Sequence, residues 1–546
     1  MGPGTRNRAW RVVLVAVVVL AGCSSSSKHG ASGSGASGAN GLTGGKRPNI
    51  LFVLTDDMRL DDLQFMPQVR SLIGDQGVSF DDYFDNVTLC CPARTSILRG
   101  QYSHNTGVLT NGGTNGGFET AHAGNVEQST IATALHDAGY TTGLFGKYLN
   151  GYPNSVSPSY VPPGWDQWSS SSKGNAYGEY DYTLNQNGNQ VDYGHGPDDY
   201  GTNVYVKQAE DFINRAAASS RPFFAYLAVY APHQPATPAP QDLNAFPGLT
   251  APRDPAFNET DVSDKPQYIQ SQPLIGAKRQ AQIDDLYRRR AQSLQAVDRG
   301  VAGLLAQLQS SHLLDNTYVV FTSDNGFHLG QHRLPAGKQT AYETDIHLPL
   351  LVRGPGIAAG SHTSALAGNV DLAPTFAALG GATLGDNPDG RSLVPLLNNP
   401  GSAPTDWRQV YLLEHWIEND SGTTASGGAQ LEPDDLDQSD DVTDSSSAAP
   451  SSTVPSTTTP PRRSKAAGTN IPEYQGLRVA GFAYVEYATG ERELYDLTND
   501  PNELQNLAGT ASAGRLDALH QRLDSLRKCA GDACRSAESA PLDLPN

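Results

Sequence analysis

The sequence predicts an α/β fold with a mostly parallel central sheet, followed by a small C-terminal α+β subdomain. Short apolar runs alternate with longer amphipathic stretches along most of the chain, which is typical of strands alternating with helices. The runs lack the alternation of half-buried strands, so we expect both faces of the sheet to be covered. A chain of 546 residues is long enough for about two to four domains or for one large α/β unit.

The strands and helices follow in order from this pattern. The expected strands cover residues 48–55, 142–145, 223–230, 317–322 and 348–352. The expected helices cover residues 129–136, 204–217, 279–308 and 372–379. Ser129 or Thr130 would cap the first of these helices, and Asp371 would cap the last.

Polar side chains follow four of the expected strands. They are Asp56, Asp57, Lys147, His233, Asp324 and Asn325. Ligands of open α/β sheets bind outside the carboxyl ends of the strands, so residues far apart in sequence can share one site. The two Asp/Asn pairs suit a hard divalent cation such as Ca²⁺ or Mg²⁺. Each pair could instead cap a helix or a turn.

Composition restricts the class of function. The chain carries 38 basic and 57 acidic residues, a net charge of −19, which disfavours binding to nucleic acid. Charged residues make up 17 % and hydrophobic ones 38 %, with 56 Gly and 36 Pro, which excludes a coiled coil, a collagen and a multi-span membrane protein. A local cationic pocket or a metal could still bind a small anionic substrate.

The N-terminus has the features of an export signal. Three arginines precede the short apolar run 12–20, which ends in Leu-Ala-Gly-Cys at Cys23. This ending resembles the bacterial lipoprotein box, which implies a signal peptide over 1–23, lipidation of Cys23 and attachment to the outer face of the cytoplasmic membrane. An ordinary secretory signal remains the alternative. The Ser/Gly-rich stretch 24–46 would be a flexible tether.

The other four cysteines form two pairs. Export favours an oxidising compartment, so we expect a local disulfide between Cys529 and Cys534, which enclose four residues. Cys90 and Cys91 are adjacent, and a bridge between neighbours is strained. Their spacing matches no zinc site. This pair therefore has no evident structural role.

The chain is expected to divide near residue 405. A catalytic domain would cover 47–405 and a C-terminal subdomain 406–535, with strands at 410–413 and 481–487, a helix at 515–526 and a tail at 536–546. A Ser/Thr/Pro- and Asp-rich segment at about 421–469 lacks aromatic residues, so we expect it to be a disordered acidic insert.

The most specific motif is Cys-x-Pro-x-Arg, from Cys90 to Arg94, followed by Leu98-x-Gly100. It is similar to the signature of the type I sulfatases, in which a separate formylglycine-generating enzyme oxidises the first Cys to formylglycine. The alternative for Cys90 is a buried structural thiol.

The resemblance covers about 47–415 and 472–535, and is strongest to the N-acetylglucosamine-6-sulfatase and extracellular endosulfatase branch. Matching segments are 49–57, 145–150, 160–165, 231–233, 322–326, 330–331, Lys338, 352–356, 493–497, 500–503 and 529–535. It implies an alkaline-phosphatase-like core and a sulfuric ester hydrolase of the EC 3.1.6 type. The substrate would be a sulfated sugar similar to N-acetylglucosamine 6-sulfate, as a small molecule or an oligosaccharide.

The resemblance also implies roles for residues. Ca²⁺, or Mg²⁺, would be held by Asp56, Asp57, Cys90, Asp324 and Asn325. A hydroxyl of the hydrated formylglycine would attack sulfur, and the second hydroxyl would then expel sulfate. Arg94 would hold the formylglycine. Lys147, His233 and Lys338 would bind the sulfuryl oxygens, and Lys338 would protonate the leaving alcohol.

The chain departs from the family pattern in three places. Ala93 stands where the family often has Ser. Leu149, followed by Asn150, stands where many arylsulfatases have a His, so the base that expels sulfate is not identified, although Asn150 could orient a water. The long basic insertion of the endosulfatases is absent, which favours an exo-acting or small-substrate enzyme.

Two other functions remain open. One is a phosphodiesterase or phosphonate hydrolase of the same superfamily, and the other is a surface lipoprotein that binds sulfated glycans without turnover. His104, His328 and His332 could each line the pocket entrance, and the sequence assigns none of them a role.

Overall fold

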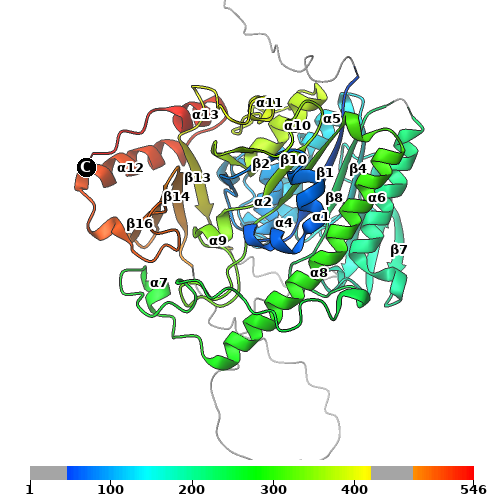
Figure 1. Cartoon of the computed structure of the whole chain (residues 1–546). Helices are drawn as coiled ribbons and strands as arrows, with labels where there is room; N and C mark the ends of the chain where they lie inside the picture. The colour runs from blue at the N-terminus through cyan, green and yellow to red at the C-terminus, as the bar shows by residue number, and fades with distance from the viewer. Residues whose placement is uncertain (1–45, 220, 420–470, 546) are drawn as a thin grey trace, which may run out of the picture. The chain divides into compact units, whose positions relative to one another are not determined.

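The computed structural model describes residues 46–219, 221–419 and 471–545. Within these residues, a ten-stranded sheet has the strand order β11-β2-β10-β9-β1-β8-β4-β5-β6-β7 (Figure 1). Its strands are β1 (Asn49–Thr55), β2 (Val78–Phe80), β4 (Thr141–Gly146), β5 (Gln167–Gly174), β6 (Tyr182–Gln186), β7 (Asn189–Tyr193), β8 (Phe223–Ala228), β9 (Thr317–Ser323), β10 (Leu350–Arg353) and β11 (Ser361–Thr363).

The centre of this sheet is parallel, as the sequence predicts. Strand β1 pairs in parallel with β8 and β9, and β4 pairs in parallel with β8 and β5. Antiparallel pairs occur toward the edges, where β10 joins β9 to β2, and β6 joins β5 to β7. The expected strand at 348–352 therefore exists as β10 but runs against the central direction.

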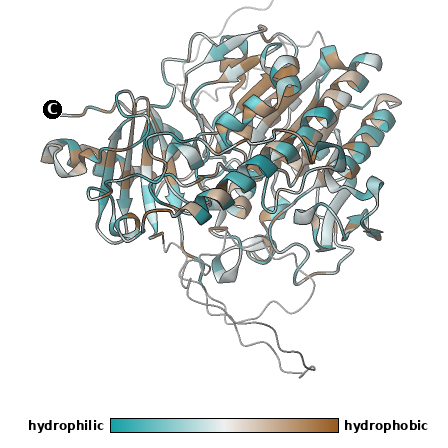
Figure 2. Cartoon of the chain, turned by 60° about the horizontal axis from the view of Figure 1, so that its bottom comes forward, coloured by the Kyte–Doolittle hydropathy of each residue, from teal (hydrophilic) through white to brown (hydrophobic). Residues whose placement is uncertain are grey.

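Helices cover both faces of the sheet. The alternate residues of β1 enter different cores, Leu51 and Val53 on one face and Phe52 and Leu54 on the other. The first face packs against α6 (Gly201–Ala217) and α8 (Ala277–Ser310), and the second against α2 (Cys90–Arg99), α5 (Ile131–Asp137) and α10 (Leu372–Gly380). Figure 2 shows the apolar strands behind helices whose visible faces are largely polar. This two-sided burial explains why the central strands are mostly apolar and lack a polar face.

One of the two predicted helix caps differs in the structure. Thr130 caps α5, since its side chain accepts a hydrogen bond from the Thr133 amide. Asp371 precedes α10 but accepts no capping bond from that helix. Its carboxylate instead accepts two 2.6 Å bonds from the buried Arg408 guanidinium, because an arginine offers a paired donor that a single backbone amide cannot match.

A separate four-stranded antiparallel sheet lies near the C-terminus. It consists of β13 (Val410–His415), β14 (Tyr474–Val479), β15 (Phe482–Tyr487) and β16 (Arg492–Asp496). The helix α12 (Ala513–Leu526) buries Leu519, Leu523 and Leu526 in the same core, and α13 (Asp532–Ser539) follows it. The predicted α+β arrangement is present, whereas the boundaries at 405 and 535 stay predictions.

Some predictions concern residues that the structure does not describe. The signal peptide 1–23 with Cys23, all but the last residue of the tether 24–46 and the insert 421–469 lie outside the described residues. Within the described ranges, no helix combines the length and apolar character that crossing a bilayer requires.

Candidate active site

The candidate site lies at the carboxyl ends of the central parallel strands. Strand β1 is followed by Asp56 and Asp57, β4 by Lys147, and β9 by Asp324 and Asn325. The segment after β8 carries His233. All six side chains are at most 5 % exposed, so each needs a polar partner inside the protein.

Cys90 occupies the first position of α2 and faces the strand ends. Its Sγ lies 3.3 Å from Asp56 Oδ1, 3.9 Å from Asp57 Oδ1 and 2.8 Å from Lys338 Nζ. The side chain is fully buried. Cys91 is also buried, but it belongs to the apolar core on the other side of the helix, and neither residue forms a disulfide with another described cysteine. Only one of the two adjacent thiols therefore enters the site.

Three buried cations are paired with three carboxylates around Cys90. Lys147 Nζ donates to Asp56 Oδ2 at 2.6 Å, and Lys338 Nζ donates to Asp57 Oδ1 at 2.7 Å. The third pair joins Nε of Arg94, one helical turn after Cys90, to Oδ2 of Asp324 at 2.8 Å. A buried charge without a partner of opposite sign is costly, so removing one member of a pair would leave the other member uncompensated.

These charges shift the pKa values of the carboxyl groups in opposite directions. Burial would raise the pKa of Asp56, but Lys147, His233 and Arg94 together hold it far below its usual value. Burial and the neighbouring Asp56 charge raise the pKa of Asp324 to about 6, despite the opposing effect of Arg94. The site therefore stabilises a permanently ionised Asp56.

His233 approaches the same group from the segment after β8. Its Nε2 lies 3.5 Å from Asp57 Oδ2, and its Nδ1 donates to the Gln234 carbonyl at 2.8 Å. The Tyr177 ring packs against the imidazole, with ring centres 4.6 Å apart. These contacts fix the orientation of the ring and leave Nε2 facing the carboxylates.

Backbone geometry at two strand ends makes the convergence possible. Consecutive side chains of an extended strand point to opposite faces. Asp57 has a φ of 65°, a left-handed conformation that turns its carboxylate toward the same site as that of Asp56. Gly146 has a φ of 115°, and a Cβ there would lie 1.9 Å from the Ala228 carbonyl oxygen. Glycine thus lets β4 approach β8 closely just before Lys147.

The donor set fits a hard divalent cation. Atoms of Asp56, Asp57, Cys90 and His233 lie within 4.8 Å of one another. Asn325 Nδ2 donates to Asp57 Oδ1 at 2.7 Å, and the buried Asn325 Oδ1 has no hydrogen-bond partner among the described residues. An orphaned amide oxygen beside two carboxylates is the ligand type that Ca²⁺ and Mg²⁺ prefer.

A small polar cavity of about 20 Å³ adjoins Lys147. Asn150, Tyr177 and Tyr230 are among its lining residues, and Asn150 Nδ2 donates to the Tyr177 hydroxyl at 3.3 Å. A space of this size holds about one water molecule. Leu149 is buried in the apolar core.

The three histidines left unassigned by the sequence are each bound to a buried carboxylate. His104 Nδ1 lies 2.7 Å from Glu414, His328 Nδ1 lies 3.0 Å from Asp345, and His332 Nδ1 lies 2.7 Å from Glu259. Burial and the nearby Lys265 charge lower the pKa of His332 to about 3. None of the three contacts Cys90 in the described residues.

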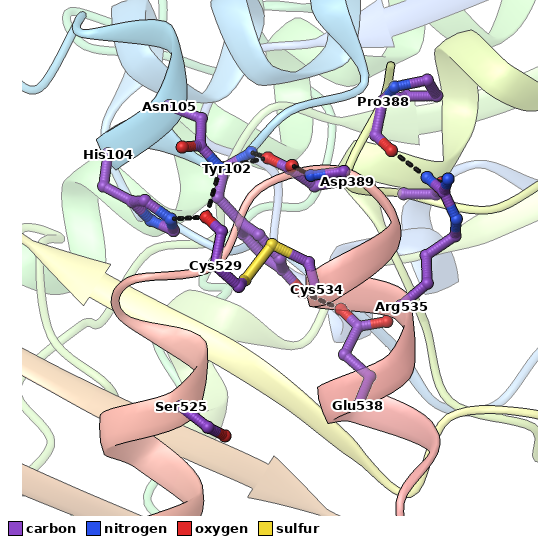
Figure 3. The surroundings of a disulfide bond; sticks show 12 residues. Tyr102, His104, Asn105, Pro388, Asp389, Ser525, Cys529, Cys534, Arg535 and Glu538 are labelled. Atoms are coloured by element: carbon purple, nitrogen blue, oxygen red, sulfur yellow. Dashed lines mark hydrogen bonds between the residues drawn. A yellow bond between two sulfur atoms is a disulfide. The ribbon is translucent and has the colours of Figure 1, made fainter.

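The C-terminal cysteines lie away from Cys90. Figure 3 shows the disulfide between Cys529 and Cys534 at the junction of α12 and α13. The Cys529 carbonyl accepts hydrogen bonds of 2.9 Å from His104 Nε2 and Asn105 Nδ2. The disulfide thus faces the segment that follows α2.

Sequence reasoning missed residues that surround the site without joining it. Tyr177 belongs to no recognisable motif. Asp345 lies in a short helix, α9 (Glu343–Ile346), and does not follow a strand. The only available signal was the position of Asp345 shortly after Lys338. A carboxylate at that spacing is too common to indicate a role.

Comparison with known proteins gives a consistent result. The Sulfatase family model matches residues 48–382. The N-acetylglucosamine-6-sulfatase of Homo sapiens is 34 % identical over 503 residues, covering 90 % of this chain and 87 % of that protein. An extracellular sulfatase homologue of Drosophila melanogaster is 36 % identical over 377 residues, covering 68 % of this chain and 33 % of that protein.

A solved structure supports the fold assignment. It is described as a complex with its substrate D-glucosamine-2-N,6-O-disulfate, and it superposes with a TM-score of 0.69 at 25 % identity. The alignment covers 88 % of this chain and 98 % of that one.

Proposed function

The chain belongs to the sulfatase family, and from this premise we propose that it removes the 6-O-sulfate of N-acetylglucosamine-like sugars through a formylglycine made from Cys90. Sulfatases of this family are sulfuric ester hydrolases with an alkaline-phosphatase-like α/β fold, and this chain is one of them. The sugar, the modified cysteine and the cation are the proposed parts.

The observation that carries the proposal is the surrounding of Cys90 Sγ. A fully buried thiol lies within 4 Å of two carboxylates and an ammonium group, at the first turn of a helix that also supplies Arg94. A structural thiol needs no such charges, because buried Cys usually behaves as a small hydrophobe. Cys91 behaves in that way one residue later.

The polar side chains have distinct proposed roles. Formylglycine at position 90 would supply a hydroxyl nucleophile. Arg94 is paired with Asp324 and also donates to the Lys147 carbonyl at 3.2 Å, so it holds the start of α2 against the end of β4. Lys147 and His233 both lie against the Tyr177 ring and would bind sulfuryl oxygens. Lys338 would protonate the leaving alcohol.

The proposed cation ligands are Asp56, Asp57, Asp324, Asn325 and the side chain at position 90. A bound Ca²⁺, or Mg²⁺, would lower the pKa of the nucleophilic hydroxyl and polarise the sulfate ester. Two ammonium groups already neutralise Asp56 and Asp57. A bound cation would neutralise these carboxylates further, so the positive charge of the two lysines would be available to the substrate.

The proposed substrate class rests on the relatives. Proteins similar over most of this chain are named N-acetylglucosamine-6-sulfatases, and the similar solved structure was determined with a glucosamine disulfate. A small sugar or an oligosaccharide end fits an acidic chain of net charge −19 better than a long polyanion does.

We also propose that the enzyme acts outside the cytoplasm. The N-terminal pattern ending at Cys23 and the extracellular relative support export, with a lipid anchor at Cys23 or secretion as the two routes. A formylglycine-generating enzyme would be the maturation partner.

The experiment is co-expression with a formylglycine-generating enzyme, followed by mass spectrometry of the Cys90 peptide and steady-state assays. We expect an aldehyde at position 90, an unmodified Cys91, and multiple turnover of N-acetylglucosamine 6-sulfate that is lost in Asp324→Ala.

Other outcomes would point elsewhere. An unmodified Cys90, while a control sulfatase is converted, would reject the proposed nucleophile. Faster turnover of aryl phosphonate or phosphodiester substrates than of any sulfate ester would assign phosphorus chemistry instead. Saturable glycan binding without turnover would indicate a binding protein.

A further inference from the structure

Asp345 is a fully buried carboxylate near the loop that carries Lys338. It lies in α9, and its carboxylate is hydrogen-bonded to His328 and Thr340 rather than to Cys90 or the carboxylates around it. We propose that Asp345 is a positioning residue that fixes Lys338 for proton transfer to the leaving alcohol. The functional half of this inference rests on the proposed function.

Asp345 holds the chain on the C-terminal side of Lys338. Its Oδ2 accepts from the Thr340 amide at 3.0 Å and from the Thr340 hydroxyl at 2.6 Å. Gln339 lies between Lys338 and Thr340 with a φ of 80°, a conformation unfavourable for a residue with a Cβ. The two hydrogen bonds from Thr340 stabilise this turn.

The same carboxylate holds the N-terminal side through a histidine. His328 Nδ1 donates to Asp345 Oδ2 at 3.0 Å and lies 3.1 Å from Oδ1. The His328 backbone exchanges two hydrogen bonds with Gly337, the residue before Lys338, at 2.7 and 3.0 Å. The backbone on both sides of Lys338 is thus linked by hydrogen bonds to Asp345, through Thr340 on one side and through Gly337 and His328 on the other.

Asp345 also links this loop to other segments of the site. Its backbone carbonyl accepts from the Gly326 amide at 2.8 Å, just after Asp324 and Asn325. The Thr340 carbonyl accepts from the Thr88 hydroxyl at 3.2 Å, two residues before Cys90. Asp345 therefore connects the loop that carries Lys338 to the end of β9 directly and, through Thr340, to the segment before Cys90.

A lysine side chain has many rotamers, so its backbone must be fixed if the ammonium group is to meet a small target. Lys338 Nζ reaches Asp57 and Cys90 at 2.7 and 2.8 Å. A displacement of about 1 Å would weaken proton transfer while leaving sulfate binding by Lys147 and His233 in place. The predicted defect is therefore selective.

The test compares two substrates and four variants. N-acetylglucosamine 6-sulfate has an alcohol leaving group that needs a proton, whereas 4-nitrocatechol sulfate has a phenol that leaves more easily. Asp345→Asn keeps the size of the side chain, so this variant is expected to fold, but its single neutral oxygen cannot accept from both Thr340 and His328 with the strength of a carboxylate. Thr340→Val removes one bond to Asp345, and Thr340→Ser restores it.

We expect Asp345→Asn and Thr340→Val to lower kcat on the sugar sulfate by about 10-fold or more, with kcat on the aryl sulfate within about 3-fold and KM nearly unchanged. Thr340→Ser should recover the sugar activity. The matched control is Asp298→Asn, because the buried Asp298 carboxylate also accepts from two backbone amides, those of Gln68 and Val69. Asp298→Asn should change kcat on the sugar sulfate and kcat on the aryl sulfate by the same factor.

A crystal structure of Asp345→Asn gives a readout that does not depend on activity. Movement of Lys338 Nζ away from Asp57 supports the inference, and an unmoved Lys338 overturns it. Equal losses on both substrates, or no loss, would also overturn it. If the wild type hydrolyses neither sulfate while Lys338 still moves in the variant, the proposed function fails and the positioning role stands.

Discussion

The adjacent residues Cys90 and Cys91 have opposite surroundings. The first side chain contacts Asp56 and Lys338, and the second packs in the apolar core. Successive helix positions differ by about 100° in direction, so one turn of α2 places neighbouring thiols on different faces. This pair offers an internal control for the role of the nucleophile.

We predict that Cys90→Ala lowers sulfatase kcat by about 10⁴-fold or more, because the proposed mechanism takes its attacking hydroxyl from position 90. Cys91→Ala should retain activity within about 3-fold and lose about 1 kcal/mol of unfolding free energy from its core contacts. Steady-state kinetics and urea unfolding measure both effects. Comparable inactivation of the two variants would contradict the assignment.

A second residue-scale prediction concerns His104. Burial would lower its pKa, but the hydrogen bond and charge of Glu414, with the Cys529 carbonyl, raise it to about 9. Because the pKa of His104 is higher in the folded state than in the unfolded chain, protonation of His104 stabilises the fold. This stabilisation is complete below the unfolded-state pKa of about 6.5 and is lost as the pH rises through about 9.

His104→Gln should therefore lower the free energy of unfolding by about 2–3 kcal/mol at pH 6 and by much less at pH 10. Denaturant unfolding at the two pH values checks this. His195→Gln is the control, since that exposed histidine should change stability little at either pH. An equal loss for His104→Gln at both pH values would show that its charge is unimportant.

At the scale of elements, the junction of β4 and β8 determines where Lys147 lies. Gly146 and Gly107 both have positive φ values, 115° and 73°. A Cβ at Gly146 would collide with the Ala228 carbonyl, whereas a Cβ at Gly107 would meet nothing within 4 Å. Substituting each glycine by alanine therefore distinguishes the cost of a left-handed backbone, at Gly107, from that cost plus a steric collision, at Gly146.

We predict that Gly107→Ala costs about 1–2 kcal/mol of stability from its left-handed backbone alone and keeps kcat. Gly146→Ala should cost more than about 3 kcal/mol, or lower kcat by about 10-fold as β4 shifts Lys147. Thermal unfolding with kinetics on the soluble fraction distinguishes the two. Equal effects of both substitutions would refute the role given to the close approach.

The elements predicted from the sequence are those buried on both sides. Strands β1, β8 and β9 are buried at every residue and β4 at all but its first, and the four strands were found with their order in the chain. Strand β7 has no buried residue and β5 carries four consecutive serines, so neither has an apolar pattern to detect. The sequence also could not show that β10 is antiparallel, because direction depends on tertiary pairing.

The candidate site was predictable only in part. Residues at strand ends could be grouped because parallel strands share one carboxyl edge. Their pairing could not be predicted, since Arg94 with Asp324 and Lys338 with Asp57 depend on side-chain distances. The histidine partners lie far away in sequence, as with His104 and Glu414, and no local pattern reveals them.

At the scale of the whole molecule, the site joins segments from residue 56 to residue 338. A cation held by several of these segments binds the folded state and not the unfolded chain, so it stabilises the entire fold. We predict that Ca²⁺ at about 100 times its Kd adds about 2.7 kcal/mol to the free energy of unfolding.

Calorimetry with Ca²⁺, with Mg²⁺ and with a chelator measures this effect. The chelator should lower Tm and abolish turnover, and added Ca²⁺ should restore both. Asn325→Ala is the matched variant, since it should fold with a Tm that no longer responds to the ion. A Tm of the wild type that is the same with ion and chelator would reject the metal site.

The complete burial of Cys90 limits the period during which an enzyme could modify this thiol. An enzyme that modifies this thiol cannot reach it once β1, β9 and the Lys338 loop have closed around it. Lys338 is synthesised about 250 residues after Cys90, a delay of roughly 10–50 s at usual translation rates. Maturation would therefore compete with folding, and slower elongation or export would increase the fraction of active enzyme.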